Sequence, residues 1–252
     1  MTSSAASRRD SRQRELIPPA RLAKAHAVVI GVGAVGRQAA LQLAAVGVPR
    51  LSLCDPDAVA AENLAPQGFW ESDLGRPKVE AVADLARRQY PRISVTAVAE
   101  RFRSSFVRGW PADREVAVFC CVDSIRTRRS VWESVRGSAA FFADGRMAAE
   151  VIRVLASGRP PEDSVYPKSL FDASEAYAGS CTAKSTIYAA SIAAGLMVGQ
   201  WARWLRDQPV TADQTLNLLA SELTVSEEPV PLRPAPGREL YSRDYNPGKE
   251  SP

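Results

Sequence analysis

The sequence predicts an α/β fold: a doubly wound, mostly parallel sheet with helices on both faces and an antiparallel extension late in the chain. Short apolar runs of strand length alternate with segments of helical periodicity, which is typical of βαβ units. A glycine-rich turn, "GVGAVG", joins the first of these runs to the first helix. The run "EVAVFCCVD" is apolar almost throughout, as expected of a parallel strand that is buried on both faces.

The first half of the chain alternates strand, helix and strand, which implies a parallel pair with a right-handed crossover. The helix after the glycine-rich turn closes at Gly47, and the next helix carries Pro77 in its first turn, where a missing N–H does no harm. We expect strands at 27–30, 50–54 and 93–99, a helix within 37–48 and a second helix at 77–90.

The second half continues the alternation and then changes character. A charged helix follows the strand at 115–123, and "AAFFADG" is expected to be another buried strand. "MAAEVIRVLAS" favours a strand, although its pattern also fits a helix, and "QTLNLLASELTV" closes with strand character. The expected helices lie at about 124–136 and, long and largely buried, within 182–207.

One domain accounts for most of the chain. We expect a disordered N-terminus at 1–9, where Ser, Ala and Arg dominate, and a Pro-rich flexible tail at 226–252. Residues 10–225 form the single domain, which contains a crossover-type flexible loop at about 158–180.

Composition argues against several function classes. The four cysteines form no CxxC pair and His26 is the single histidine, which makes a zinc site improbable. The net charge of +4 is spread over Arg-rich helices, so no nucleic-acid partner is expected. The longest apolar run, 187–201, is shorter than the about 20 residues of a membrane span, and the polar N-terminus does not resemble a secretory signal. We therefore expect a soluble, cytoplasmic protein without a membrane partner.

The turn over residues 31–36 has the spacing of a Rossmann-like nucleotide-binding loop. Gly31 allows the tight turn, Gly33 lets the backbone approach a phosphate, and Gly36 lets helix and strand pack closely. Asp55 follows at roughly the 20 residues expected of a carboxylate that binds ribose hydroxyls.

This motif does not choose among NAD, FAD, SAM and ATP, and a tight turn without a ligand is the plain structural alternative. An NAD(P)-dependent oxidoreductase is therefore one hypothesis. The chain lacks an obvious catalytic dyad for hydride transfer, because its histidine precedes the first strand, although Lys or Tyr can take that part.

The residues after Asp55 narrow the choice. The stretch "DPDAVAAENLAPQGFWESDLGRPKVEAV" resembles the ATP-binding segment of the ubiquitin-activating superfamily, the ThiF/MoeB/HesA group, whose pattern is D-x-D-x-V-x-x-x-N-L-x-R-Q followed by G-x-x-K. "CCVDSIRTRRS" resembles the family's strand-end D-[NS]-x-x-x-R, and "DSRQRELIPPARLAKAHAVVIG" resembles its N-terminal helix with a Y/S-R-Q motif. The similarity spans roughly residues 10–146. The matching positions are Arg12, Gln13, Asp55, Asp57, Val59, Asn63, Leu64, Gln67, Gly75, Lys78, Asp123, Ser124 and Arg128.

The resemblance implies a single ThiF-like adenylation domain that uses ATP and Mg²⁺. Such an adenylyltransferase activates the C-terminal glycine of a ubiquitin-like or sulfur-carrier protein, as a homodimer. Cations around the phosphates stabilise the transition state, and Lys78 together with Arg12 of the partner subunit would supply them. Asp123, at the end of its strand, would bind Mg²⁺. The implied nucleotide-binding residues are Asp55 at the ribose, Asp57, Asn63 at the phosphates or at metal-bound water, Gln67, and the three glycines of the turn.

Plainer interpretations stay open for several of these residues. Lys78 can be a solvated helix residue, and Asp123 can be the N-cap of the helix that begins at Ser124. Arg76 and Arg128 can be surface cations.

Pro66 is the main departure from the family pattern, which has Arg at this place. A phosphate cation is thereby lost, so either Arg76 or another nearby arginine compensates, or adenylation is weakened. A third hypothesis follows, a catalytically weak scaffold that keeps the fold and the dimer. The family's zinc cysteines are missing too, which leaves the distal half to be held by packing. Arg146, in "DGRMAAE", is expected to line the substrate channel.

Cys181 stands in "GSCTAKST", which resembles the C-T-x-[KR] setting of the thioester cysteine in larger ubiquitin-activating enzymes. A helix N-terminus and Lys184 would favour its thiolate, which could then receive the acyl group as a thioester or a persulfide-linked species. The alternative is a small residue that seals a helix end. The other three cysteines, Cys54, Cys120 and Cys121, are expected in the core.

Overall fold

A single eight-stranded sheet organises the protein, whose computed structural model describes residues 9–110, 113–171 and 185–226. The strand order is β3-β2-β1-β4-β5-β6-β7-β8. Pairing is parallel from β3 to β5 and antiparallel from β5 to β8, which confirms the predicted fold class. The strands are β1 (Ala25–Ile30), β2 (Arg50–Cys54), β3 (Ser94–Val98), β4 (Glu115–Cys120), β5 (Phe141–Ala148), β6 (Val151–Ser157), β7 (Asp213–Asn217) and β8 (Glu222–Val225).

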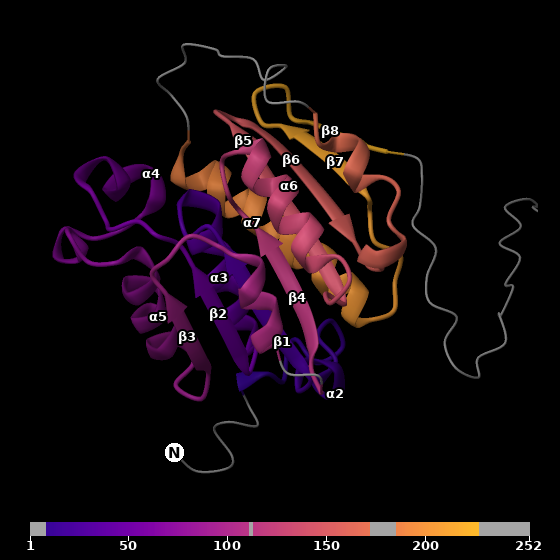
Figure 1. Cartoon of the computed structure of the whole chain (residues 1–252), viewed down its shortest axis with the longest axis horizontal. Helices are drawn as coiled ribbons and strands as arrows, with labels where there is room; N and C mark the ends of the chain where they lie inside the picture. Colours follow the sequence, from indigo (N-terminus) through magenta and orange to yellow (C-terminus); the bar gives the residue numbers. More distant parts are fainter. Residues whose placement is uncertain (1–8, 111–112, 172–184, 227–252) are drawn as a thin grey trace, which may run out of the picture.

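Helices cover both faces of the sheet (Figure 1). Three long helices pack side by side on one face, and α6 covers the other. The two shortest, α2 and α4, lie at opposite ends of the sheet in Figure 1. The helices are α2 (Pro19–Leu22), α3 (Ala34–Val46), α4 (Leu64–Gln67), α5 (Lys78–Gln89), α6 (Ile125–Val135) and α7 (Ile187–Leu205), with α3, α5 and α7 on the shared face. Short segments of 3-10 helix occupy Ala61–Asn63, Glu71–Asp73, Ser104–Gly109, Pro160–Glu162 and Tyr166–Ser169.

Two apolar cores result from the alternation of side chains along the central strands. In β1, Val29 faces the core beneath α3 and α7, whereas Val28 faces the core beneath α6. In β4, Phe119 packs against Trp201 of α7 with 6.2 Å between the ring centroids. Both strands are therefore buried on both faces, as their continuous apolar sequences predict.

The later strands settle an ambiguity of the sequence. β5 continues to Ala148, and the chain turns at Ala149, which has φ 53°, into antiparallel β6. "MAAEVIRVLAS" is thus a turn and a strand, not a helix. "QTLNLLASELTV" forms two strands, β7 and β8, rather than one.

The N-terminal segment differs from the expected helix. Residues 10–16 form turns, and the chain enters the short helix α2 after Pro18. Side chains hold these turns to the end of α3, since Gln13 Nε2 donates to Val46 O over 2.7 Å and Arg9 to Ala45 O over 2.8 Å. These side-chain hydrogen bonds to the last carbonyl groups of α3 thus fix the N-terminal segment in place.

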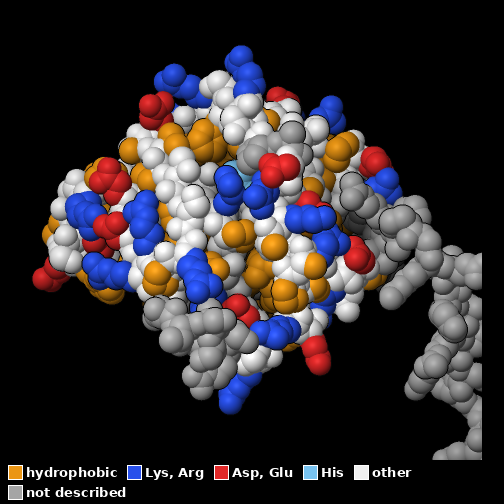
Figure 2. Space-filling model, turned by 90° about the horizontal axis from the view of Figure 1, so that it is seen from below, with side chains coloured by type: hydrophobic (Ala, Val, Ile, Leu, Met, Phe, Trp, Pro, Cys, Tyr) orange, Lys and Arg blue, Asp and Glu red, His pale blue; other side chains and the backbone are white. Residues whose placement is uncertain are grey.

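The surface agrees with the modest net charge. Figure 2 looks onto the amino ends of the strands, where Lys and Arg side chains are interspersed with acidic ones around a small patch of His. Within the part of the chain that the structure describes, no helix combines the length and apolar character needed to cross a membrane. The expected disorder at 1–8, the loop from 172 to 180 with Cys181, and the tail at 227–252 lie outside the described residues.

Candidate functional site

The glycine-rich turn leads from β1 into α3 at the carboxyl edge of the parallel strands. Gly31 has φ 86°, and a side chain on it would lie 2.7 Å from the carbonyl oxygen of Cys121. A Cβ on Gly36 would lie 1.8 Å from the Gly31 carbonyl oxygen. Gly33 is the N-cap of α3 and cannot cap it with a side chain, so the first N–H groups of the helix are available to an anion.

Asp55 follows β2 and braces this turn. Its Oδ2 accepts from Val32 N over 2.6 Å, and its Oδ1 accepts from Asp57 N over 2.8 Å. Burial raises the pKa of the Asp55 carboxyl, while the two backbone N–H groups and the charge of Lys78 oppose that rise. Each carboxylate oxygen retains a lone pair, so Asp55 can still accept from a ligand hydroxyl.

Lys78, the first residue of α5, is buried, with 5% of its surface exposed. Its Nζ lies 3.2 Å from Asp57 Oδ2, and its backbone N–H donates to Asp57 O over 2.9 Å. The interpretation of Lys78 as a solvated helix residue is therefore wrong. Asp57 itself is exposed, so this ion pair stands at the edge of the solvent.

α4 lies across the glycine-rich turn. Asn63, which precedes it, accepts at Oδ1 from Ala60 N over 3.0 Å and so shapes the loop. The side chain of Gln67 reaches Gly33: a Cβ there would be 3.8 Å from Gln67 Oε1. That Oε1 atom is buried and has no hydrogen-bond partner among the described residues. Pro66 occupies the turn of α4 beside it.

Asp123 lies beyond the end of β4, between the strand and α6. It is exposed, and the N-cap of α6 is Ser124, whose Oγ accepts from Thr127 N over 3.4 Å. The interpretation of Asp123 as the helix cap is therefore wrong, and its carboxylate is free of that task. In the described ranges, no three His, Cys, Asp or Glu side chains gather into a metal cage.

The strand order places a topological switch point at this edge. After β1 the chain crosses to α3 on one face, and after β4 to α6 on the other, which makes the boundary between β1 and β4 a topological switch point. Open α/β sheets bind ligands at such points, outside the carboxyl ends of the strands. Gly31, Asp55 and Cys121 directly follow the three adjacent strands β1, β2 and β4.

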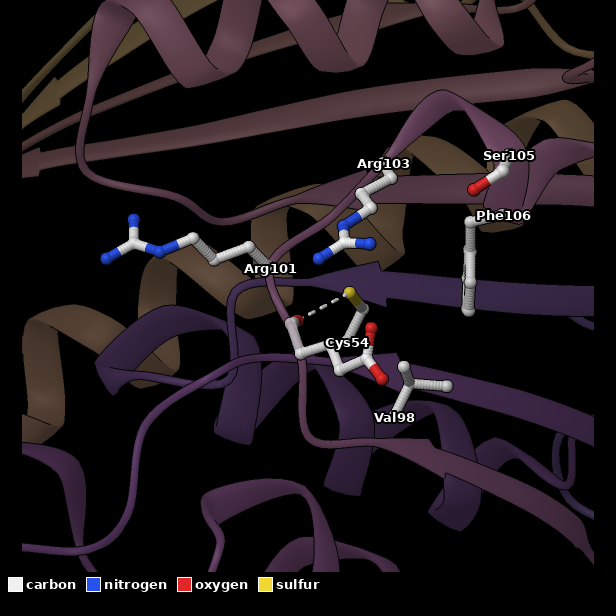
Figure 3. Close-up of a pocket in the computed structure, with 7 residues that line it drawn as sticks. Cys54, Val98, Arg101, Arg103, Ser105 and Phe106 are labelled. Carbon is white, nitrogen blue, oxygen red and sulfur yellow. Dashed lines mark hydrogen bonds between the residues drawn. The ribbon is translucent and has the colours of Figure 1, made fainter.

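A cavity of about 270 Å³ opens beside Asp55, at the ends of β2 and β3. In Figure 3, Arg103 and Phe106 extend over Cys54 and Val98. The thiol of Cys54 donates to Glu100 O over 3.3 Å. This volume lies just below the usual range of ligand pockets, about 300–1,000 Å³. The lining residues are Cys54, Val98, Glu100, Arg101, Arg103, Ser105 and Phe106.

Arg12 is far from this edge within its own chain. It is exposed on the turns at 10–16, which Gln13 fixes to Val46 at the C-terminal end of α3. The glycine-rich turn is at the other end of this helix, and 13 residues of helix span about 20 Å. The structure thus separates Arg12 from the residues that the sequence grouped with it.

Two of the arginines singled out in the sequence, Arg128 and Arg146, meet in a buried network. Asp144, fully buried at the end of the apolar part of β5, binds Arg128 and also accepts from Arg146 Nε over 2.8 Å. Tyr166 Oη donates to the same carboxylate over 3.1 Å. Arg146 further donates to Ser169, to its carbonyl over 3.0 Å and to its hydroxyl over 2.8 Å. The interpretation of Arg128 as a surface cation is therefore wrong, and its burial lowers the pKa of its guanidinium.

Arg76 is not a free cation. Its guanidinium binds Asp84 over 2.7 Å and Asp73 over 3.3 Å. Compensation for Pro66 by this arginine would therefore cost both ion pairs. Sequence reasoning missed the Asp144 network, whose signal was an acidic residue that ends the otherwise apolar run "AAFFAD".

The described cysteines belong to the core, as predicted. Cys54 and Cys120 are buried, and Cys121 is half-buried directly after β4. Burial, with the charges of Asp55 and Glu100, raises the pKa of the Cys54 thiol to about 11. Burial also raises the pKa of Cys120 and of Cys121. None of these three thiols is set up as a nucleophile.

The glycine-rich turn, the carboxylate that braces it and the switch point between β1 and β4 define a Rossmann-like α/β protein. More specifically, the chain belongs to the ThiF family, which it matches over residues 12–235.

Three curated relatives match over less than half of the chain. It is 32% identical over 111 residues to the molybdopterin-synthase adenylyltransferase of Salmonella typhimurium and 33% identical over 112 residues to the sulfur carrier protein ThiS adenylyltransferase of Escherichia coli, and in each case the match covers 44% of both proteins. It is 38% identical over 99 residues to the SAMP-activating enzyme E1 of Haloferax volcanii, covering 39% of this chain and 37% of that enzyme. The matched segment thus spans less than half the length of these relatives.

Solved structures extend the likeness of fold over most of the chain. PaaA, as its selenomethionine crystal structure, superposes with a TM-score of 0.73 over 91% of this chain and 75% of its own, at 18% identity. E. coli MccB with ATP superposes with a TM-score of 0.65 over 82% of this chain and 64% of its own, at 16% identity. At these identities the likeness establishes the fold.

Proposed function

We propose that this chain is an ATP-dependent adenylyltransferase that activates the C-terminal glycine of a ubiquitin-like or sulfur-carrier protein. The observation that carries the proposal is the convergence of the glycine-rich turn, Asp55 and the Lys78–Asp57 pair at one edge of a ThiF-family sheet. Three of the relatives are named as enzymes that adenylate or activate carriers of this kind, which supports it.

The geometry suggests where ATP would lie. The phosphates would meet the N-terminus of α3, where the N–H groups and the helix dipole favour an anion. Asp55 would accept from the ribose hydroxyls, and the adjacent cavity would take the base. Lys78 would exchange part of its contact with Asp57 for a phosphate oxygen. Asn63 and Gln67 would lie close by, on the segment of residues 60–69 that contains α4, which we call the covering loop.

Asp123 would hold Mg²⁺ together with the phosphates. The fit is that of an exposed carboxylate at a strand end, since Mg²⁺ usually takes one or two carboxylates plus phosphates rather than a full protein cage. When bound, the ion would neutralise charge on the phosphate oxygens. The chain's own residues would align the α-phosphate with the carrier's carboxylate, whose attack releases pyrophosphate and leaves an acyl adenylate.

A homodimer would complete the site. Arg12 lies at the far end of α3 from its own glycine-rich turn, so it can contribute to a phosphate site only in another subunit. The Cys181 thiolate would then attack the carbonyl carbon of the acyl adenylate, which would form a thioester and release AMP. A carrier adduct that is cleaved by thiols, seen by mass spectrometry in the wild type and lost in Cys181→Ala, is the expected result; an adduct that persists in the variant excludes this thiol.

ATP–pyrophosphate exchange with carriers that end in Gly-Gly tests the proposal. Exchange should depend on the carrier and should disappear in Asp123→Ala but not in Glu133→Ala, which removes an exposed carboxylate of α6. Absence of exchange with every carrier encoded nearby contradicts the proposal. Tight NADH binding would then favour the oxidoreductase hypothesis, and ATP binding without exchange would favour the scaffold.

A further inference from the structure

Arg37 is a buried cation beside the glycine-rich turn that no motif singled out. It directly follows Gly36 in the first turn of α3, and its backbone N–H donates to Gly33 O over 2.9 Å. Only 6% of its surface is exposed. The side chain extends beneath the covering loop, because a Cβ on Gly68 would lie 3.1 Å from Arg37 Nη1 and 3.6 Å from its Cζ.

The guanidinium of Arg37 lacks a counter-anion among the residues that the structure describes. Its Nε is buried without a hydrogen-bond partner. The acid that influences it electrostatically, Asp73, is bound to Arg76 and to Trp70 N instead. The guanidinium lies over the ring of Phe69, with Cζ 5.2 Å from the centroid. A buried and unpaired charge is costly, so this arrangement is expected where an anion is to be bound.

A second unsatisfied group lies on the same loop. Gln67 Oε1 is buried and unpartnered in the described structure, and the amide lies against Gly33. Its oxygen and nitrogen can exchange places by a flip, so the amide can also donate. Both groups thus lie near the N-terminus of α3. Gln67, which follows Pro66 in α4, lies over the glycine-rich turn, and the side chain of Arg37 lies beneath the covering loop.

We propose that Arg37 binds the triphosphate of ATP and supplies the cation that Pro66 does not. The proposal rests on the proposed function for the identity of the anion. Arg37 and Pro66 belong to different elements, but a Cβ on Gly68, two residues after Pro66, would lie 3.1 Å from Arg37 Nη1, so the guanidinium lies close to this loop. A small shift of the loop would expose the guanidinium to phosphates at the helix N-terminus, where a planar bidentate donor suits them.

Calorimetric titration of the full chain with ATP and with adenosine, in the presence of Mg²⁺, tests this. Arg37→Met keeps the apolar stem on Phe69 and removes the charge; it should weaken ATP about 10- to 100-fold and leave adenosine unchanged. Arg37→Lys should retain part of the affinity, and adding Pro66→Arg to Arg37→Met should restore it. Arg76→Met, which removes a cation held by two carboxylates, is the matched control and should leave ATP binding unchanged.

Several outcomes overturn the proposal. Equal losses for ATP and adenosine in Arg37→Met, or unchanged ATP affinity, exclude a phosphate contact, as does failure of Pro66→Arg to restore binding. A lowered melting temperature of ligand-free Arg37→Met indicates a structural residue, because removal of an unpaired buried charge should leave it equal or higher. Wild-type ATP binding without pyrophosphate exchange refutes the proposed function and leaves Arg37 supported; no ATP binding refutes both.

Discussion

Acidification should destabilise this protein through one residue, His26 in β1. Its ring is buried, with 8% exposed, and Nε2 lies 2.9 Å from Ser52 Oγ, while Nδ1 has no partner among the described residues. Burial, then the charges of Arg50 and Arg114, lowers its pKa from 6.5 to about 4. The His26 ring therefore stays neutral in the folded state at pH values at which it is already protonated in the unfolded chain.

The sign and size follow from linkage. Because the folded pKa is depressed below the unfolded value, the neutral ring contributes its full stability above pH 6.5 and loses it as the pH falls toward 4. Each pH unit in this window costs up to about 1.4 kcal/mol, so a change from pH 7 to pH 5 should lower the free energy of unfolding by at most about 2 kcal/mol.

Urea unfolding at pH 7, 6 and 5 measures this loss. His26 is the only histidine of the chain, so His26→Gln should remove this part of the pH dependence and leave the carboxylate background. Ser52→Ala, which removes the hydrogen bond but keeps the ring, should retain it. If wild type and His26→Gln lose the same free energy between pH 7 and pH 5, the reasoning is refuted.

Three further predictions concern stability and reactivity. Asp144→Asn should cost about 3–5 kcal/mol in urea unfolding, since it leaves buried guanidinium groups unpaired, whereas Asp213→Asn, whose partner Arg153 is 41% exposed, should cost under about 1 kcal/mol; equal costs would contradict this. Gly31→Ala should lower stability by more than about 1 kcal/mol, because of its positive φ and the Cys121 carbonyl, and an unchanged melting temperature would show otherwise. At pH 8 iodoacetamide should leave Cys54 unmodified in the native protein, because the pKa of the Cys54 thiol is raised to about 11. Rapid labelling of the peptide that contains Cys54 would contradict the raised pKa.

The strands and the fold class follow closely from the sequence because local signals agree with the global fold. The apolar runs of β1 and β4 require burial on both faces, and the turn chemistry of Gly31 and Gly47 fixes where strand and helix end. The β5–β6 hairpin was ambiguous, since its turn at Ala149 carries no Gly, Pro or Asn to mark it.

The environment of the site was less predictable, because motifs record spacing along the chain and not burial. Lys78 and Arg128 are ordinary surface types in the sequence, yet both are buried beside acids. Arg37 belongs to no recognised pattern, and its importance arises from the position of Gly68 and Phe69 in space. Conversely, Arg12 fits a motif but lies at the wrong end of α3 within its own chain.

The position of Arg12 allows the proposed dimer to be tested by complementation between two inactive variants, without a structure of the dimer. If each site combines Asp123 of one subunit with Arg12 of the other, then Arg12→Ala and Asp123→Ala are inactive alone but complementary. In a mixed dimer one site holds both wild-type residues and the other holds neither. Random exchange makes about half of the dimers mixed, so about one quarter of wild-type pyrophosphate exchange should return on mixing. Failure to recover activity, with subunit exchange shown by mass spectrometry, would mean that Arg12 does not act across an interface.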